Sequence, residues 1–156
     1  MTDFRAKAKQ FFDEYQKANI NFDVEQIAGC YAAVFMFADP KGVRCVKKED
    51  FLKVLPRRKE FFSSLGLISS LIESTEAAEL DSHYLSVKTV WKMRFRRSTG
   101  ELIDCRNLAT YILAASGDSF EIVFQLDHQD LMERTKELGL TADLQKHDPA
   151  ERNPIN

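Results

Sequence analysis

The stretch LSVKTVWKMRFR, residues 85–96, decides the fold class because its side chains alternate with a period of two. Every second position is apolar or uncharged: Leu85, Val87, Thr89, Trp91, Met93 and Phe95. The positions between them are mostly polar or basic: Ser86, Lys88, Val90, Lys92, Arg94 and Arg96. Such alternation is typical of a long β-strand with one face in the core and the other in water.

The basic row of this stretch, Lys88, Lys92, Arg94 and Arg96, has two interpretations. It could bind an anion. It could also form a solvated outer sheet face, or an interface in which acids on a partner strand pair with it. We favour the second interpretation, because opposite charges on neighbouring strands stabilise a sheet.

Further strands are expected beside this stretch, at residues 67–80, 102–115 and 119–126. Turn-forming residues separate them: Asp81-Ser82, Ser98-Thr99-Gly100 and Ser116-Gly117-Asp118. In the last strand one face is apolar: Phe120, Ile122, Phe124 and Leu126. Alternation places Asp127 on the opposite face, with Glu121 and Gln125, and leaves open which face looks inward.

The first part of the chain is helical. Residues 3–18 carry apolar side chains at helical spacing and predict a helix with Thr2 as its N-cap. A shorter helix begins at Asp23, and Gln26 stands three residues later as in a capping box. The run AVFMFA, residues 33–38, predicts a short buried strand.

Two further helices are expected. Residues 48–65 have the helical pattern, but Pro56 must kink this helix or split it in two, and Gly66 fits as its C-cap. A short helix is expected at residues 129–138. The tail from residue 141 is polar, carries Pro149 and Pro154, and is expected to be disordered.

This order of helices followed by long strands predicts an α+β fold: a curved antiparallel sheet wrapped around N-terminal helices to form a cone with an interior pocket. The chain of 156 residues fits one cone domain, residues 1–140, with a polar tail, residues 141–156. Twelve phenylalanines indicate an aromatic interior.

Composition excludes several classes of function. The net charge of −2 provides no field for nucleic acid or an anionic membrane, and no apolar run reaches the roughly 20 residues of a membrane helix. The N-terminus lacks the apolar run of a signal peptide. Three separated cysteines, Cys30, Cys45 and Cys105, then predict reduced thiols in a cytoplasmic protein. The histidines lack metal-ligand spacing, so neither zinc nor another metal or cofactor is expected.

Two stretches resemble the nuclear-transport-factor-2-like superfamily, which has the cystatin-like cone fold. FFDEYQKANINFDVEQIAGCYAAVFMFADPKG, residues 11–42, is similar to the N-terminal part of ketosteroid isomerase, and LDHQDLMERTKELGL, residues 126–140, resembles the end of the polyketide-cyclase-like branch. The resemblance extends over residues 3–140. It implies a homodimer that associates through the convex face of the sheet.

The resemblance also implies site residues. Asp39 corresponds to the general base of the isomerase, Tyr15 to its oxyanion-hole tyrosine, and Asp127 to a catalytic acid or base of the cyclase-like branch. The second oxyanion-hole aspartate of the isomerase corresponds to Ala109, so this element is missing. Asn107 lies on the same strand face and could donate a hydrogen bond in its place.

Each of these residues has a structural alternative. Asp39-Pro40-Lys41-Gly42 is a good type I turn, in which the Asp39 side chain would accept backbone N–H groups. Tyr15 could be a core tyrosine with one hydrogen-bond partner. Asp127 could be an N-cap of the last helix, an interpretation that we favour.

The sequence therefore supports two hypotheses. The first is an isomerase or cyclase that moves a proton on a small hydrophobic carbonyl compound without a cofactor, using Asp39, Tyr15 and Asp127. The second is a non-catalytic module of the same fold that binds a ligand or another protein. The expected pocket lining is the same for both: Phe12, Phe35, Phe37, Phe51, Leu55, Trp91, Asn107 and Tyr111.

Overall fold

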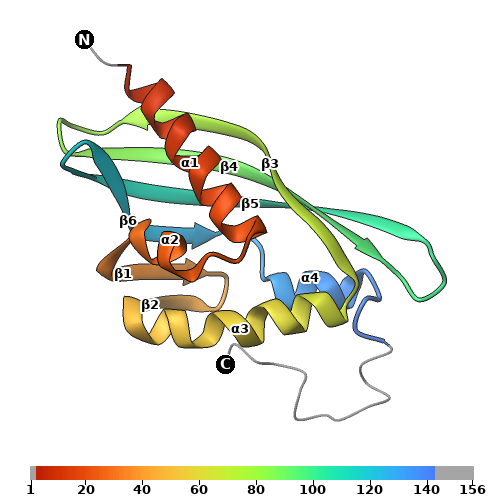
Figure 1. The fold of residues 1–156 in the computed structure, drawn as a ribbon. Coiled ribbons are helices and arrows are strands. Elements are labelled where there is room, and N and C mark those ends of the chain that lie inside the picture. The colour runs from red at the N-terminus through yellow and green to blue at the C-terminus, as the bar shows by residue number, and fades with distance from the viewer. Residues whose placement is uncertain (1–2, 143–156) are drawn as a thin grey trace.

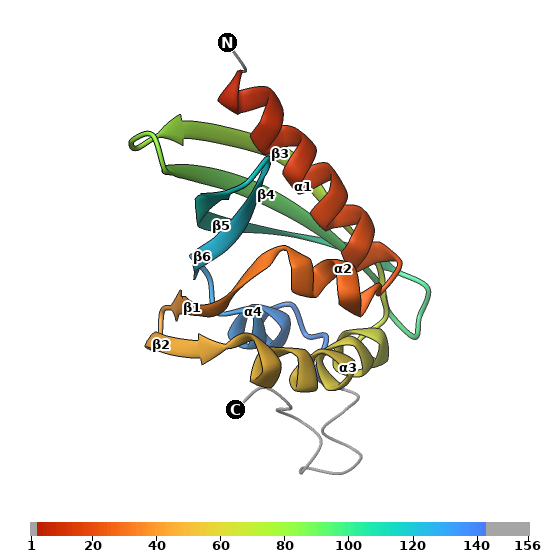
Figure 2. The ribbon, with the colours of Figure 1, turned by 60° about the vertical axis from the view of Figure 1, so that its left-hand side comes forward.

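A computed structural model describes residues 3–142 and has the α+β cone fold. Six strands form one sheet in the order β2-β1-β6-β5-β4-β3. Helix α1 packs across the long strands, while α3 and α4 lie at the other end of the molecule with β1 and β2 (Figure 1). Figure 2 shows the same arrangement from the side, with the helices on one side of the curved strands. The predicted tail lies outside the described residues, apart from a turn at residues 141–142.

The two N-terminal helices begin at aspartate caps. Helix α1 spans Phe4–Ile20, and the Asp3 side chain accepts the N–H of Arg5 at 2.9 Å. The prediction of Thr2 as the cap falls outside the described residues. Helix α2 spans Val24–Gly29, and the Asp23 side chain accepts the N–H of Gln26 as the capping pattern predicts.

A hairpin follows, and only the first of its two strands was predicted from the sequence. Strand β1, Tyr31–Asp39, contains the predicted apolar run, and β2, Gly42–Lys47, was not predicted. All residues of β2 except Val46 are exposed, so the strand lacks the alternation that marks the others. Strand β1 pairs antiparallel with β2 and parallel with β6, so the sheet is mixed rather than wholly antiparallel.

Helix α3 spans Lys48–Ser64 and runs through Pro56 without being split. Pro56 lies on the exposed side of the helix. Because the proline removes one backbone N–H, the carbonyl left without a partner on this side faces water, which limits the cost. Gly66 follows the C-cap Leu65 with a φ of 90°, as predicted.

The four long strands form the predicted meander: β3, Leu67–Glu79; β4, Tyr84–Arg96; β5, Leu102–Ser116; and β6, Ser119–Asp127. In β4 the face containing Leu85, Val87 and Phe95 is buried. The inward side packs on α1 through a cluster that includes Phe12 and Tyr31, both almost completely buried.

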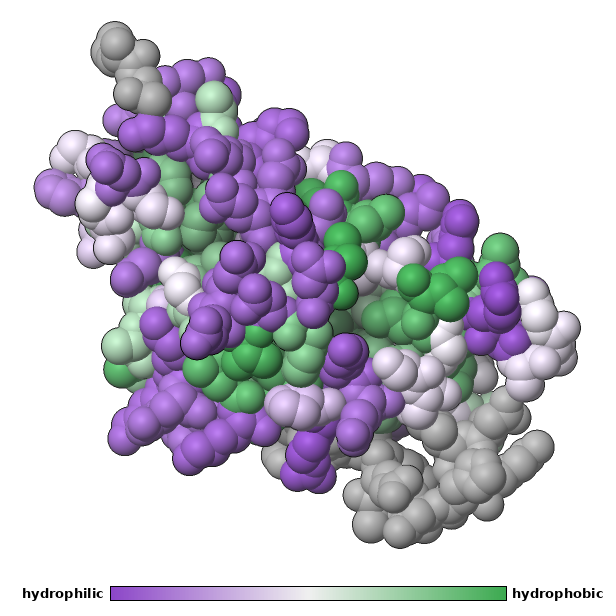
Figure 3. All heavy atoms as spheres, in the orientation of Figure 1, coloured by the Kyte–Doolittle hydropathy of each residue, from purple (hydrophilic) through white to green (hydrophobic). Residues whose placement is uncertain are grey.

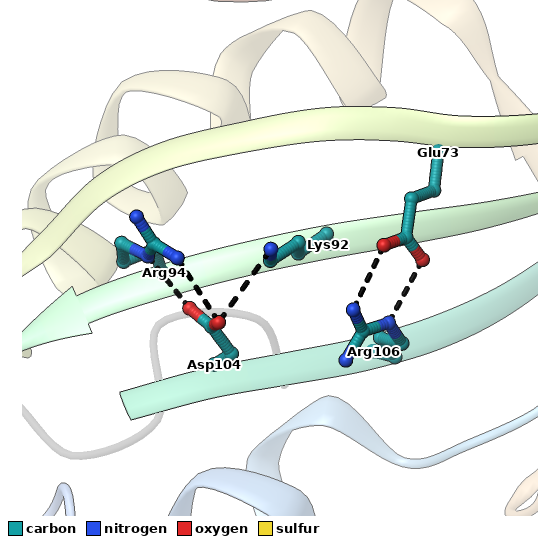
Figure 4. A network of polar contacts seen from close by, with 5 residues as sticks. All are labelled: Glu73, Lys92, Arg94, Asp104 and Arg106. Carbon is teal, nitrogen blue, oxygen red and sulfur yellow. Dashed lines mark hydrogen bonds and ion pairs between the residues drawn. The ribbon is translucent and has the colours of Figure 1, made fainter. Parts of the chain in front are cut away.

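Two residues of the basic row of β4, Lys92 and Arg94, are paired within the sheet (Figure 4). Arg94 forms two hydrogen bonds to Asp104 on β5, at 2.7 and 3.1 Å, and Lys92 lies 3.6 Å from the same carboxylate. On the same face, Arg106 of β5 binds Glu73 of β3 with two bonds of 2.8 Å. Arg94 holds the pKa of Asp104 at about 2. For Lys92 and Arg94 this arrangement matches the interpretation of cross-strand pairs rather than that of an anion site.

A β-bulge in β6 reverses the face that points inward. Ile122 pairs with Leu113, whereas Phe124 pairs with Ile112, so Val123 is an extra residue in β6. Before the bulge Ile122 faces the core, and after it Gln125 lies beside Tyr111 on the inward face. The prediction of a continuous alternation through Leu126 is therefore wrong beyond Val123, because a bulge shifts the period by one residue.

Helix α4 spans Leu131–Glu137 and begins later than predicted. Its N-cap is Asp130, whose side chain accepts the N–H groups of Met132 and Glu133. The interpretation of Asp127 as the N-cap is therefore wrong. Asp127 is instead the last residue of β6.

Candidate functional site

A cavity of about 520 Å³ opens between the sheet and the helices. Its inner wall comes from β4, β5 and β6, and α1 and α3 supply the opposite wall. Four exposed apolar side chains also line it, namely Ile20, Ile68, Leu71 and Leu108. Figure 3 shows hydrophobic side chains on both sides of a hollow between α1 and α3. The volume suits a ligand of two or three fused rings.

Most of the expected pocket residues line this cavity: Phe37, Phe51, Leu55, Trp91, Asn107 and Tyr111. Phe12 and Phe35 do not, and both are buried in the core. The Phe12 ring packs against Tyr111 with centroids 4.9 Å apart, so it supports the wall from behind. Phe35 packs against Tyr31 and Phe51 in the same way.

A polar network crosses the inner wall, formed by Tyr15, Tyr31, Gln125 and Asp127. The hydroxyl oxygens of Tyr15 and Tyr31 are 2.7 Å apart. The Tyr31 hydroxyl donates to Gln125 Oε1 at 2.8 Å, and Gln125 Nε2 donates to Asp127 Oδ1 at 3.2 Å. All four residues line the cavity.

The direction of this network limits what Tyr15 can do. A phenol has one proton, and Tyr31 donates its proton to Gln125. Tyr15 must therefore be the donor in its bond to Tyr31. A Tyr15 proton committed in this way is not free for a ligand, which separates Tyr15 from the oxyanion role that the resemblance implies.

Burial raises the pKa of each of the three tyrosine hydroxyls in the wall, at Tyr15, Tyr31 and Tyr111. The hydroxyls therefore stay protonated at neutral pH. They give the inner wall a set of neutral hydrogen-bonding groups within an aromatic surface.

Asp127 is the only carboxylate among the described residues that line the cavity. Removal from water raises its pKa, while Arg58 and the Gln125 hydrogen bond lower it and the charge of Asp39 raises it. Its cross-strand neighbour on β5 is Ala109, whose small side chain leaves the space above the sheet open. Asp127 is thus a partly buried carboxylate that lines the cavity.

Asp39 lies next to the cavity and does not line it. Its side chain accepts the N–H of Lys41 at 2.9 Å, as the alternative interpretation of a turn predicts. Lys41 in turn forms an ion pair of 3.2 Å with the α4 cap Asp130. The pairing of Ala38 with Leu126 brings Asp39 and Asp127 to neighbouring strand ends, which explains how the Asp39 charge acts on Asp127.

Trp91 contributes the one indole of the wall. Its Nε1 atom is buried and has no hydrogen-bond partner among residues 3–142. The N–H is near enough to the Tyr111 hydroxyl to oppose the effect of burial on the pKa of that tyrosine, but the two groups do not form a well-aligned hydrogen bond. The Tyr15 ring packs edge-on against the indole with centroids 6.1 Å apart. The Trp91 N–H is therefore an unsatisfied donor enclosed within the wall, beside the Tyr111 hydroxyl.

Asn107 lies opposite Trp91 on β5. Among the described residues, its side chain forms hydrogen bonds only with the sulfur atoms of Met93 and Cys105. Sulfur is a weak partner for an amide, so Asn107 is a second polar group of the wall that a ligand could satisfy.

The register gives the separation between Asp127 and Trp91. Asp127 pairs with Ala109, Ala109 pairs with Thr89, and Trp91 follows two residues later on the same face. With strands about 4.8 Å apart and a rise of about 3.3 Å per residue, the two backbones are roughly 12 Å apart. A small ring compound can contact both side chains across this distance.

Sequence reasoning missed two parts of this site. Gln125 was placed on the face away from the apolar residues, and only the bulge at Val123 turns it toward the tyrosines. Arg58 is not among the pocket residues expected from the sequence, yet it lines the cavity. Among residues 3–142 no group of three or more His, Cys, Asp and Glu side chains could hold a metal ion.

The family model of NTF2-like proteins named DUF6841 matches residues 5–130. The chain belongs to this family. None of the curated proteins is significantly similar to it in sequence. No helix within residues 3–142 is long and apolar enough to cross a membrane.

Solved structures of this NTF2-like fold resemble the chain at low sequence identity. Aln2 from a Streptomyces species has 14% identity and a TM-score of 0.66, over 86% of this chain and 97% of that one. A ketosteroid isomerase-like protein from Erwinia carotovora atroseptica has 14% identity and a TM-score of 0.62, over 82% and 97%. The β subunit of benzoate 1,2-dioxygenase from Burkholderia mallei has 18% identity and a TM-score of 0.64, over 84% and 93%. These identities establish a shared fold alone.

Proposed function

We propose that this NTF2-like protein is an isomerase or cyclase that moves a proton on a small hydrophobic carbonyl compound. The observation that carries the proposal is Asp127, a carboxylate with a raised pKa in the wall of an aromatic cavity. A base of this kind combines a usable ionised form with a stronger affinity for protons than an exposed aspartate has. Among solved structures of the fold, the ketosteroid isomerase-like protein is consistent with this class of reaction.

In the proposed step the Asp127 carboxylate takes a proton from the carbon beside the carbonyl group. The electrons of the broken C–H bond form a C=C bond, and the carbonyl π electrons move to oxygen. The protonated Asp127 then returns the proton to the same carbon or to another carbon of the enol system. This sequence conserves atoms and electrons and requires no cofactor.

Trp91 is the proposed donor to the oxygen on which charge develops. Its indole N–H is buried and has no partner among the described residues. Protein atoms enclose this nitrogen, so the substrate oxygen reaches it only after a local side-chain movement, and the hydrogen bond then stabilises the enolate. Tyr15 does not take this role, because its proton is donated to Tyr31.

The polar network gives Asp127 a fixed orientation. Gln125 donates to one carboxylate oxygen, Oδ1, and so leaves the other oxygen for the substrate. Tyr31 holds the opposite end of the Gln125 amide. In this proposal Gln125 and Tyr31 are therefore positioning residues that keep the base aimed at the cavity.

The experiment is proton exchange in D₂O with 2-tetralone, a two-ring ketone that fits the cavity volume. Proton NMR follows the loss of the signals beside the carbonyl group. The native protein is expected to accelerate exchange above the rate in matched buffer, because a positioned general base contributes about 10²–10⁴-fold. Exchange at the buffer rate, with 2-tetralone shown to bind by ligand-observed NMR, would contradict the proposal.

The second candidate is a non-catalytic module that holds a hydrophobic ligand. Four exposed apolar residues around the cavity favour it, namely Ile20, Ile68, Leu71 and Leu108. The hydrogen bond from Tyr15 to Tyr31 also favours it. Because of this bond Tyr15 is not free to act as an oxyanion donor, and Ala109 replaces the second donor of the isomerase. Binding of the ketone without exchange is the result that this candidate predicts.

A further inference from the structure

Two cations on α3 line the cavity and form no ion pair with any carboxylate of residues 3–142. They are Arg58 and Lys59. Among the described residues of the wall, their only acidic counterpart is Asp127, which Arg58 affects through its charge without lying within 4 Å of it. The cavity wall therefore carries more positive than negative charge, although the whole protein is slightly acidic.

Both cations are held in place by aromatic rings that also line the cavity. The Arg58 guanidinium lies 5.1 Å from the centroid of the Phe62 ring, and Lys59 Nζ lies 4.4 Å from the centroid of the Phe22 ring. Such contacts restrict a long side chain to one region without neutralising its charge. The charges are therefore fixed at the cavity and remain available to an anion.

The backbone at Phe22 adds a second observation. Phe22 has a φ of 50°, and it is the one residue other than glycine with a positive φ among residues 3–142. A left-handed conformation is costly for a residue with a Cβ atom, and glycine or asparagine normally takes this place after a helix. The phenylalanine at this place supplies the ring that Lys59 contacts. Strained residues of this kind cluster at ligand sites.

We propose that the ligand of this cavity is an amphipathic ring compound whose anionic group binds Arg58 and Lys59. Its apolar rings lie against the aromatic wall. The inference deepens the proposed function, because it concerns the same cavity. It also applies if the cavity only binds its ligand, since the two cations take no part in the proton transfer.

The test compares two fluorescent probes with the same aromatic body. The anionic probe is 8-anilinonaphthalene-1-sulfonate, and the neutral one is N-phenyl-1-naphthylamine, which lacks the sulfonate. The double variant Arg58→Gln with Lys59→Gln is expected to bind the sulfonate probe about tenfold more weakly, because two charge-assisted contacts are lost. The affinity for the neutral probe is expected to change less than about twofold.

A matched double variant controls for overall charge. Lys53→Gln with Arg57→Gln removes two charges from α3 at exposed positions that do not line the cavity. This control is expected to keep the affinity for both probes. Circular dichroism establishes that each variant is folded, and titration establishes one site per chain.

Three results would overturn the inference. The Arg58 and Lys59 variant could lose the same factor of affinity for both probes, or the control variant could lose as much affinity for the sulfonate probe as the Arg58 and Lys59 variant does. The third is that the native protein binds neither probe. Failure of the proposed function gives a different combination of results. Selective loss of the sulfonate probe without ketone exchange supports the anion site and rejects the catalysis. Ketone exchange by the native protein, together with unchanged sulfonate binding in the Arg58 and Lys59 variant, rejects only the anion site.

Discussion

Replacing Asp127 by asparagine is expected to lower the rate of α-proton exchange on 2-tetralone by about 10²–10⁴-fold. Asparagine keeps the shape of the side chain and can still bond to Gln125, but it has no carboxylate to take a proton. Binding of the ketone should be nearly unchanged, because the rings contact the aromatic wall. The measurement is the exchange rate by proton NMR at saturating ketone.

The matched control is Asp39→Asn. Asp39 accepts a turn N–H and does not line the cavity, so this variant should keep most of the exchange rate. If Asp39→Asn abolishes exchange and Asp127→Asn does not, the assignment of the base reverts to the residue that the resemblance implies. Equal, partial losses in both variants would also contradict a single base at Asp127.

Replacing Gly66 by alanine is expected to destabilise the fold more than any other substitution proposed for this chain. Gly66 joins α3 to β3, has a φ of 90°, and leaves no room for a side chain: an added Cβ would lie 2.1 Å from the carbonyl oxygen of Arg96. This oxygen belongs to the backbone at the end of β4, and Arg96 also donates its N–H to the Gly66 carbonyl at 2.8 Å. Strain and overpacking together should cost about 3–5 kcal/mol.

Gly100→Ala separates the clash from the backbone strain. Gly100 has a φ of 91°, nearly that of Gly66, but nothing lies within 4 Å of its added Cβ. It should therefore cost only the roughly 1–2 kcal/mol of a left-handed residue. Urea unfolding of both variants gives the difference, and equal losses would show that the contact with Arg96 is relieved by a small movement.

The long strands were predictable because their side chains alternate between water and core. In β4 the alternation from Leu85 to Phe95 runs without a break, so the buried face could be assigned residue by residue. Strand β2 was missed for the converse reason, because both of its faces are largely exposed. The sequence left open whether Pro56 kinks α3 or splits it, because the rule for proline does not include exposure, and Pro56 lies on the exposed side.

The candidate site was predictable only in part. Trp91 and Tyr111 followed from the strand pattern, and the turn at Asp39 followed from the local preference of Asp-Pro-Lys-Gly. The inward position of Asp127 did not, because one extra residue at Val123 exchanges the two faces of β6. The direction of the Tyr15 hydrogen bond depends on Gln125, a partner far along the chain on β6, and no local pattern contains it.

Stability should also depend on the ionisation of Asp127. Its folded pKa is raised above the ordinary 3.8, so its contribution to stability is complete below that value. The contribution is then lost as the pH rises through the folded pKa, because the ionised form is disfavoured in the folded protein. Asp104 behaves in the opposite sense: its folded pKa of about 2 means that its contribution is lost as the pH falls from about 4 to about 2.

Titration of the aspartate side-chain carboxyl carbons by ¹³C NMR tests the central claim, that the end of β6 holds the base, most directly. Asp127→Asn assigns the Asp127 signal, and Asp104, with its pKa of about 2, serves as the internal reference for a lowered group. We predict a midpoint for Asp127 clearly above 3.8, moving down in the Asp39→Asn variant, which removes a neighbouring negative charge. A midpoint at or below 3.8 would mean that Asp127 is a solvated or tightly paired carboxylate, and it would contradict the account of this residue as the base.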